Sequence, residues 1–388
     1  MDSAHHSNWP LVILLWLAGL GAAAQYGKIS VVFDALPAIY PQAGASLGFA
    51  VSLVGAVGIA LGVVAGVVVA RLGFRPAVLG GLVFGAVLSF AQAFLPPLPL
   101  FLALRVLEGG AHLALVVALP TFIAQLTTPQ DRGVALTLWG TFFGVAFAIL
   151  AWFGRPFAAQ FGLAALFAAH GVYLAFMAGL LWRLLPAQAE GAARPSSGGV
   201  LRAHWRIYSS PWIGAPAVGW LFYTFAFVSV LTVLPPYLGP DNRAWVIGAM
   251  PLMSILSSLT LGVWLLRRIG PVGVIVAGFG ACFLAALGLI LWPGSAGPAL
   301  ALGAALGLVQ GASFAAVPEL NEAIEARALA NGGLAQMGNL GNTIGTPILL
   351  WVISGGGYLG MTIVLCMAFL MGGLAHLALA RLRARGQS

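Results

Sequence analysis

Long apolar runs, interrupted by short clusters of arginine, glycine and proline, dominate the hydropathy pattern of the chain. A membrane-spanning helix needs about 20 apolar residues to cross about 30 Å of hydrocarbon, and each run is long enough to do so. The pattern therefore predicts an all-α integral membrane protein with twelve transmembrane helices. Their expected ranges are 9–37, 46–70, 77–95, 99–126, 134–154, 162–185, 211–236, 244–266, 271–292, 298–318, 333–354 and 357–380.

The composition agrees with this prediction. Hydrophobic residues make up 61% of the 388 residues and charged residues only 7%, whereas about a quarter of a soluble protein is charged. Twelve helices of about 22 to 25 residues leave only about 90 to 120 residues for connections and tails. No aqueous domain of ordinary size fits into that remainder, so we expect no soluble catalytic domain.

The longest predicted connection divides the chain into two halves. We expect an N-terminal six-helix bundle at 1–185, a cytoplasmic linker at 186–210 and a C-terminal six-helix bundle at 211–388. The halves echo each other, because Arg71-Leu72-Gly73 after the second span returns as Arg268-Ile269-Gly270 after the eighth. Two pseudo-symmetric bundles are typical of transporters.

The basic residues predict the orientation. If both termini are cytoplasmic, all but four of the 17 basic residues fall in the inner connections. The exceptions are Lys28 and Arg105 within spans, and Arg155 and Arg243 in outer connections. The positive-inside rule then predicts a multi-pass inner (plasma) membrane protein. Because the arginines are spread over loops rather than gathered into a groove, we expect no nucleic-acid partner.

Two stretches carry a family pattern. Span four and its exit loop contain Arg105, Gly109, Gly110 and Pro120, followed by the turn 131–133. The loop after span two carries a second pattern of glycines and arginines, formed by Gly66, Arg71, Gly73 and Arg75.

These stretches resemble the major facilitator superfamily, and the resemblance covers essentially the whole chain. It implies a secondary transporter that moves a small-molecule substrate by alternating access, in a lipid bilayer and as a monomer. The resemblance also implies gating roles for six residues of the two loops, which are Gly66, Arg71, Gly73, Arg75, Asp131 and Arg132. One departure from the family pattern is Ala70, which stands where the family usually has an acidic residue. Exporters of this superfamily usually have a proline-containing motif in span five, whereas the run 140–145 has no proline. This favours uptake. Proton-antiport efflux of drugs or metabolites is the alternative, and a sensor without flux is a third reading.

Three ionisable residues lie on one face of span four. Arg105, Glu108 and His112 are separated by three and four residues, which places them on the same side of a helix. Burying an ionisable group at membrane depth costs free energy, so such a residue is by default a candidate for a functional role. We therefore expect this face to meet a water-filled cavity. Glu108 and His112 are the candidates for proton coupling, because a carboxyl and an imidazole can both exchange a proton.

Span one adds Gln25 and Lys28. At 1.5 Å per residue, Lys28 and Glu108 each lie about 8 Å outward of their helix centres, so the two side chains are at the same depth. They could form an ion pair, which would leave Arg105 as surplus positive charge suited to an anionic substrate. Gln25, Lys28 and Arg105 are therefore candidate substrate-binding residues. The alternative is a salt-bridge cluster that only joins the two helices.

The C-terminal half offers neutral polar residues instead. Gln336, Asn339 and Asn342 form a stripe on span eleven, with Gln310 on span ten and Tyr223 on span seven. Amides can bind a carboxylate or carbonyl group without adding charge, so we predict that these five residues contact substrate. The alternative is helix packing, because Asn and Gln also join spans by hydrogen bonds.

No enzyme or cofactor motif is found in the sequence. It has no Gly-x-x-x-x-Gly-Lys phosphate loop, no His-Glu-x-x-His and no Cys-x-x-Cys. We therefore expect no enzymatic activity, no cofactor and no metal. The expected partners are a small-molecule substrate, protons and the lipid bilayer.

Overall fold

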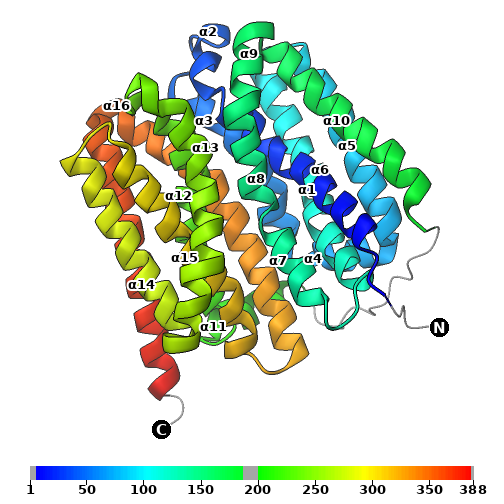
Figure 1. The fold of residues 1–388 in the computed structure, drawn as a ribbon, viewed down its shortest axis with the longest axis vertical. Helices are drawn as coiled ribbons and strands as arrows, with labels where there is room; N and C mark the ends of the chain where they lie inside the picture. The colour runs from blue at the N-terminus through cyan, green and yellow to red at the C-terminus, as the bar shows by residue number, and fades with distance from the viewer. Residues whose placement is uncertain (1–5, 187–199, 386–388) are drawn as a thin grey trace. The chain divides into compact units, whose positions relative to one another are not determined.

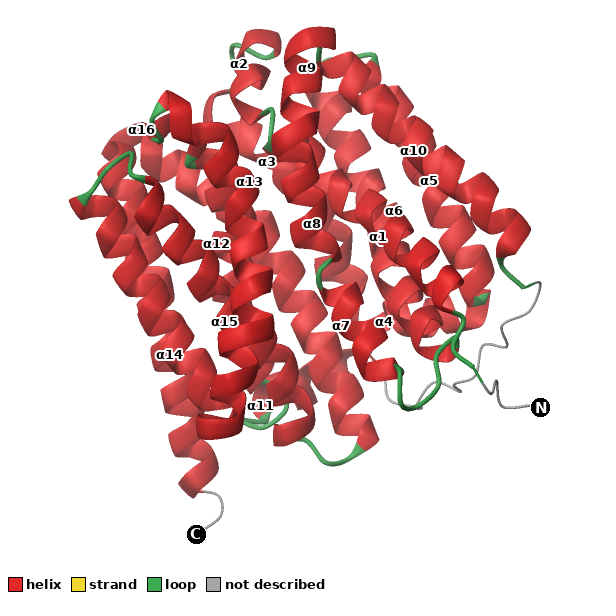
Figure 2. Ribbon diagram, viewed as in Figure 1, coloured by secondary structure: helices red, strands yellow, loops and turns green. Residues whose placement is uncertain are grey.

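The structure, a computed structural model, describes residues 6–186 and 200–385 (Figure 1). Within these ranges the regular elements are all helices, with no strand (Figure 2). Nine helices of the described part are long and apolar enough to cross a membrane, or ten if the pair Gly44–Ser52 and Val54–Gly62, bent by 55°, is one span. The prediction of an all-α membrane protein is confirmed.

Two of the long helices contain a backbone break. The segments Pro240–Leu291 and Ala326–Arg385 are each continuous by length and composition, but Gly270 and Gly357 within them have non-helical backbone angles. Each break separates two apolar segments that the hydropathy pattern treats as successive spans. The arrangement is consistent with twelve spans.

The chain forms two compact units. Unit 1 comprises residues 1–40 and 64–196, and unit 2 comprises residues 41–63 and 197–388. The helix α4 (Val54–Leu72) therefore contributes its first half to unit 2 and its second half to unit 1. The predicted domain boundaries at 185 and 211 stay a prediction, and most of the predicted linker lies outside the described residues.

Unit 1 contains the helices of the first predicted half apart from η2, α3 and the start of α4. Its core lies between α1, α5, α6 and α10 and includes Leu15, Val78, Leu115, Leu119 and Leu181, each with 0% exposure. The elements are α1 (Trp9–Ser30), η1 (Phe33–Ala35), α2 (Leu36–Ile39), α5 (Phe74–Ala93), α6 (Leu98–Gln125), α7 (Arg132–Gly140), α8 (Phe142–Ile149), η3 (Leu150–Gly154), α9 (Arg155–Phe161) and α10 (Leu163–Leu184).

Unit 2 contains the remaining helices. Within it α12 packs against α16, and α14 packs against α15 and α16. Figure 1 shows these helices. Its elements are η2 (Gly44–Leu47), α3 (Gly48–Ser52), α11 (Val200–Ser209), α12 (Ala215–Val233), η4 (Pro235–Tyr237), α13 (Pro240–Ser257), η5 (Ser258–Gly262), α14 (Val263–Leu291), α15 (Ala296–Leu320) and α16 (Ile324–Arg385).

The sequence echo between the halves corresponds to a shared backbone conformation. Gly73, between α4 and α5, has φ 89° and ψ 146°, and Gly270, inside α14, has φ 66° and ψ 167°. Positive φ is a region that residues with a Cβ rarely adopt, so glycine is needed at both turns. Gly162, between α9 and α10, and Gly357, inside α16, also have positive φ. Each lies between two successive predicted spans.

Close packing of α12 against α16 depends on small residues, as is common in membrane proteins. A Cβ added to Gly341 would lie 2.5 Å from the carbonyl oxygen of Leu221 and 2.7 Å from the backbone nitrogen of Phe225. Both are backbone atoms, which cannot rotate away from an added Cβ as a side chain could.

We therefore expect Gly341→Ala to destabilise the protein. Overpacking of this kind costs about 1–3 kcal/mol, and a lower midpoint of thermal unfolding in detergent would show it. Gly280→Ala is the matched control, because a Cβ there meets nothing within 4 Å and alanine has the higher helix propensity. Equal midpoints for the two variants would contradict the prediction.

Candidate functional site

Polar side chains from four helices of unit 1 meet in its interior. They come from α1, α5, α6 and α10, whose other inward positions are mostly apolar. On the first three helices they are spaced three or four residues apart, which places them on one helix face. The members are Gln25 and Lys28 on α1, Ser89 and Gln92 on α5, Arg105, Glu108 and His112 on α6, and His170 on α10. We call this set the charged cluster.

The carboxylate of Glu108 is the centre of the charged cluster. Its Oε1 lies 2.8 Å from Lys28 Nζ, and its Oε2 accepts a hydrogen bond of 2.7 Å from Gln92 Nε2. Arg105 donates to the same Oε2. Three donors from three helices therefore hold this carboxylate, and hydrogen bonds to a charged form favour that form.

Lys28 makes three polar contacts through its Nζ. Besides Glu108, it donates to Ser89 Oγ at 2.8 Å and approaches His170 Nδ1 at 3.2 Å. An ammonium has three donors. Each of the three N–H groups of Lys28 thus has a partner, while the Phe167 ring lies 5.6 Å from Nζ.

The contacts of His170 define its protonation. Its Nε2 lies 2.9 Å from the carbonyl oxygen of Gly21, which can only accept, so Nε2 carries a proton. Its Nδ1 faces the ammonium of Lys28, which can only donate, so Nδ1 presents its lone pair. We therefore assign His170 as the neutral Nε2–H tautomer, following its partners.

His112 lies beside the ion pairs rather than in them. Its Nδ1 is 3.0 Å from the carbonyl oxygen of Ala22 and 3.2 Å from Gln25 Oε1. Both partners are acceptors, so Nδ1 is assigned as the donor. The ring also packs edge-on against Tyr26, with centroids 5.2 Å apart.

The charged cluster is buried and carries surplus positive charge. Lys28, Arg105 and Glu108 each have 0% exposure, and His112 has 6%. Two cations face one carboxylate, so the three side chains sum to one positive charge when all are ionised. Arg105 also donates to the backbone oxygen of Gln25 at 2.7 Å.

The ion pair between Lys28 and Glu108, predicted from depth along the helices, is confirmed. The sequence also predicted a water-filled cavity beside span four. In this conformation the side chains of Arg105, Glu108 and His112 point into the bundle and are buried, so no such cavity is open at these residues. The reason is that α5 and α10 supply polar partners that the analysis of α1 and α6 did not include.

Three members of the charged cluster were missed by the sequence analysis. Ser89 and Gln92 are neutral and look like ordinary polar residues of span three, although their spacing of three was a signal. His170 was recognisable as a histidine at membrane depth, but its partners lie on α1 and α5, far away in sequence.

The remaining predicted substrate residues belong to unit 2. Tyr223 is buried and stacks on Trp220, with ring centroids 4.4 Å apart. Gln310 is half-buried, and its Oε1 accepts a hydrogen bond of 3.4 Å from Ser254. Both lie between helices of unit 2. Contact with substrate stays a prediction for these two residues, and helix packing is the alternative.

Gln336 is tied to two other elements. Its Nε2 donates to the carbonyl oxygen of Ile59 at 3.0 Å and approaches His204 Nε2 at 2.8 Å. Its Oε1 accepts a hydrogen bond of 2.7 Å from the Tyr208 hydroxyl. Burial raises the pKa of Tyr208 to about 12, so this hydroxyl keeps its proton at neutral pH. These contacts join α16 to α4 and to α11, which lies in the predicted linker.

The other two amides of the stripe differ from each other. Asn339 packs against Gly58 and donates to the carbonyl oxygen of Ala335 at 2.8 Å, contacts that are typical of helix packing. Asn342 Oδ1 has no hydrogen-bond partner within the described part of the chain. Of the three amides, Asn342 therefore keeps the best capacity to bind a solute.

Apart from Gly66, which lies within α4, the predicted gating residues lie at helix ends in unit 1. Arg75 donates to the carbonyl oxygen of Trp182 at the end of α10, at 2.9 Å. Asp131 accepts a hydrogen bond of 2.5 Å from Ser7, and Arg132 donates to Ala124. Gly73 forms the turn described above. The surroundings of Gly66 and the side chain of Arg71 lie outside what the structure describes, and gating by all six residues stays a prediction.

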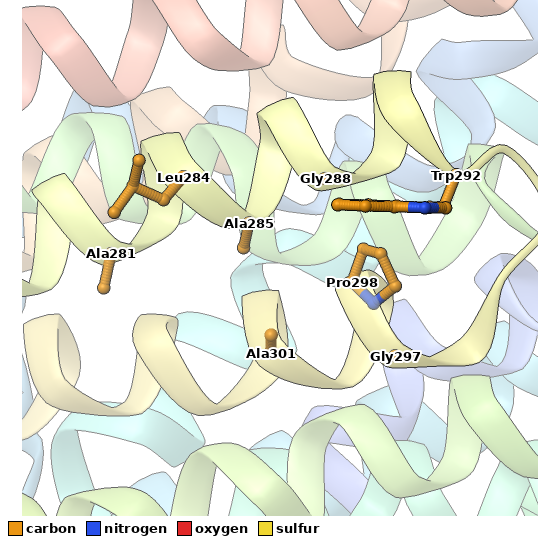
Figure 3. A pocket seen from close by; sticks show the side chains of 8 residues that line it. All are labelled: Ala281, Leu284, Ala285, Gly288, Trp292, Gly297, Pro298 and Ala301. Atoms are coloured by element: carbon orange, nitrogen blue, oxygen red, sulfur yellow. The ribbon is translucent and has the colours of Figure 1, made fainter.

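A separate pocket of about 380 Å³ lies between α14 and α15 (Figure 3). It is lined by alanine, glycine, leucine and proline side chains and by Trp292, and none of the predicted site residues is among them. A solute site needs a few convergent polar groups for orientation, which this lining does not supply. The charged cluster is therefore the better candidate.

Apolar spanning helices around a buried set of charges define a multi-pass membrane transporter, because ionisable groups at this depth mark substrate and ion pathways. Comparison with protein families supports this class. The sequence model of the family described as Major Facilitator Superfamily matches residues 11–322. The chain belongs to the major facilitator superfamily.

A solved structure described as a Major Facilitator Superfamily transporter, FucP, in the outward conformation is similar in fold. It matches with a TM-score of 0.67 and 16% sequence identity, over 95% of this chain and 98% of that chain. The search of curated proteins found no match. Membership of the major facilitator superfamily makes the chain a secondary transporter for a small-molecule substrate and not an enzyme.

Proposed function

We propose that this transporter moves a small organic anion by alternating access, coupled to protons and in the direction of uptake. The observation that carries the proposal is the charge of the buried cluster, in which Lys28 and Arg105 face the single carboxylate of Glu108. A surplus buried cation is costly unless a counter-charge is available. An anionic solute would supply that counter-charge.

Gln25 supports a binding role beside the two cations. It has 0% exposure, and its Nε2 has no hydrogen-bond partner among the described residues. An unpaired buried donor costs free energy, and an oxygen of a bound solute would offset that cost. We assign Gln25, Lys28 and Arg105, all in unit 1, to the anion subsite. Asn342 in unit 2 is a separate candidate for contact with a solute.

Proton coupling is assigned to the same cluster. Glu108 and His112 are the candidates from the sequence, and the hydrogen bonds described above favour the ionised form of Glu108. Uptake rests on the incomplete exporter motif in span five. An inner-membrane location, cytoplasmic termini and a monomeric state complete the proposal and rest on the arginine distribution and the family.

The test is solute flux in proteoliposomes. A panel of radiolabelled mono- and dicarboxylates, preselected by thermal shift because a bound ligand stabilises the folded state, is offered under an inward proton gradient. We expect at least one to accumulate above its external concentration and to leak out when a protonophore collapses the gradient.

Other outcomes of this experiment would contradict the proposal. Loss of amphiphilic cations from loaded vesicles, without anion accumulation, would indicate proton-antiport efflux. The absence of flux for every solute, together with a stable protein partner, would indicate a sensor. Vesicles without protein provide the background rate.

A further inference from the structure

The chain contains many arginines but a single lysine. Lys28 is the only lysine among the 388 residues, and the other 16 of the 17 lysine and arginine residues are arginines. Arginine stays protonated in proteins, whereas a buried lysine can release its proton. The one ammonium among these strongly basic side chains thus lies in the charged cluster, with 0% exposure.

The surroundings of Lys28 supply partners for an ammonium. Among the described residues, the charged or titratable groups facing it are Glu108 and Arg105 from α6 and His170 from α10. Ser89 from α5 adds a hydroxyl at 2.8 Å. On the other side of α1, Gly27 meets the apolar side chains of α8 and η3.

The same partners also suit a neutral amine. Ser89 Oγ lies 2.8 Å from Lys28 Nζ, 2.9 Å from His170 Nδ1 and 2.9 Å from the carbonyl oxygen of Phe167. A hydroxyl can both donate and accept, and it rotates to suit its partners. When Lys28 is neutral, the hydroxyl of Ser89 can donate to the lone pair on Nζ, so neither form of Lys28 leaves a buried group unpaired.

The charge of the cluster then depends on this one proton. With Lys28 protonated, two cations face Glu108 and one positive charge is left for an anion. With Lys28 neutral, Arg105 and Glu108 balance each other and no surplus remains. Anion affinity and protonation of Lys28 are therefore linked, and linkage of this kind is reciprocal.

We propose that Lys28 carries the coupling proton of the transport cycle, and that Ser89 and His170 are positioning residues for its amine. The inference rests on the proposed function and replaces Glu108 and His112 in the coupling role. One N–H bond of the ammonium breaks, the electron pair stays on Nζ, and the proton passes to water when the cluster opens. Anion and proton thus bind together and leave together.

The single lysine makes a direct test available. Lysine labelled with 13C at Cε places one labelled side chain in the full-length protein, and the Cε chemical shift differs between ammonium and amine. We expect the Lys28 signal of the purified protein in nanodiscs to move from the ammonium to the amine position between about pH 6 and about pH 9. An ordinary exposed lysine, with a pKa near 10.4, does not do so in this range.

Arg183→Lys is the matched reference, because residue 183 is exposed at the end of α10 and adds a second, ordinary amine to the same sample. A Lys28 signal that stays at the ammonium position over the whole range, as the reference signal does, would overturn the inference. A signal that stays at the amine position throughout would overturn it as well.

The positioning role has its own readout. Ser89→Ala and His170→Gln should each shift the midpoint of the Lys28 titration, whereas Ser229→Ala should not, because Ser229 is a buried serine of unit 2 that bonds to its own helix. A purely structural role would lower thermal stability without moving the midpoint. Unchanged midpoints in both variants would remove Ser89 and His170 from the proposal.

The two proposals can fail separately. Proton-driven accumulation of an anion, together with a Lys28 signal that does not titrate, would leave the proposed function standing and refute the coupling role of Lys28. A titrating Lys28 in a protein that moves no anion would refute the proposed function instead.

Discussion

Replacing Glu108 by glutamine should destabilise the protein by about 3–5 kcal/mol, the usual cost of removing one partner from a buried ion pair. The variant leaves Lys28 and Arg105, both with 0% exposure, without their common counter-charge. Glutamine keeps the size of the side chain, so the change is electrostatic rather than steric. Unfolding by denaturant in mixed micelles measures the effect.

A second ion pair in unit 1 provides the control. Arg155 Nη2 lies 2.6 Å from Asp34 Oδ2, but the two side chains are 29% and 36% exposed. Exposed pairs contribute about 0–1 kcal/mol, so Asp34→Asn should cost far less than Glu108→Gln. Similar losses for the two variants would show that burial does not determine the strength of the Glu108 pairs.

Arg105→Gln should reduce anion transport by about 100-fold while the protein stays folded. Truncating a charge that pairs with a buried partner costs about 2–5 kcal/mol of binding, which corresponds to a factor of about 30 or more. The fold should persist because Lys28 and Glu108 remain paired at 2.8 Å. The initial rate of uptake of the anion identified in the flux screen is the measurement.

Arg155→Gln is the matched control for this loss. It removes an arginine from the same unit, outside the charged cluster, and should leave transport unchanged. Full transport by Arg105→Gln would show that the surplus positive charge does not bind substrate.

The double variant Arg105→Gln with Glu108→Gln decides between binding and structural roles. If both side chains only stabilise each other, the double variant should regain the transport that each single variant loses, because their coupling is removed together. If Arg105 binds the anion, the double variant should stay inactive. Recovery of transport would therefore refute the substrate role of Arg105.

The pairing of Lys28 with Glu108 shows how far a sequence argument reaches. Helical rise gives the depth of each residue in the membrane, and charges at one depth are natural partners. Rise says nothing about rotation of neighbouring helices around their axes, however. That rotation brings Gln92 to Glu108 and His170 to Lys28, and neither contact was predicted.

Gln336 shows the same limit. The polar stripe on span eleven was recognisable from its spacing, but its first amide bonds to His204 and Tyr208 of α11. The sequence analysis interpreted that segment as part of a linker, because its arginine-rich composition does not show which side chains face a neighbouring helix.

The sequence by itself determined the membrane class, the approximate positions of the spans, the family resemblance and the ionisable residues at membrane depth. These properties depend on local composition and on the length of helix needed to cross a bilayer. Only the tertiary structure decided which polar groups surround Lys28 and Glu108, because those contacts join α1, α5, α6 and α10 across 16 to 142 positions of the chain. The physical reason is that a buried charge has to be satisfied by whichever helices pack around it, and one-dimensional periodicity does not contain that packing.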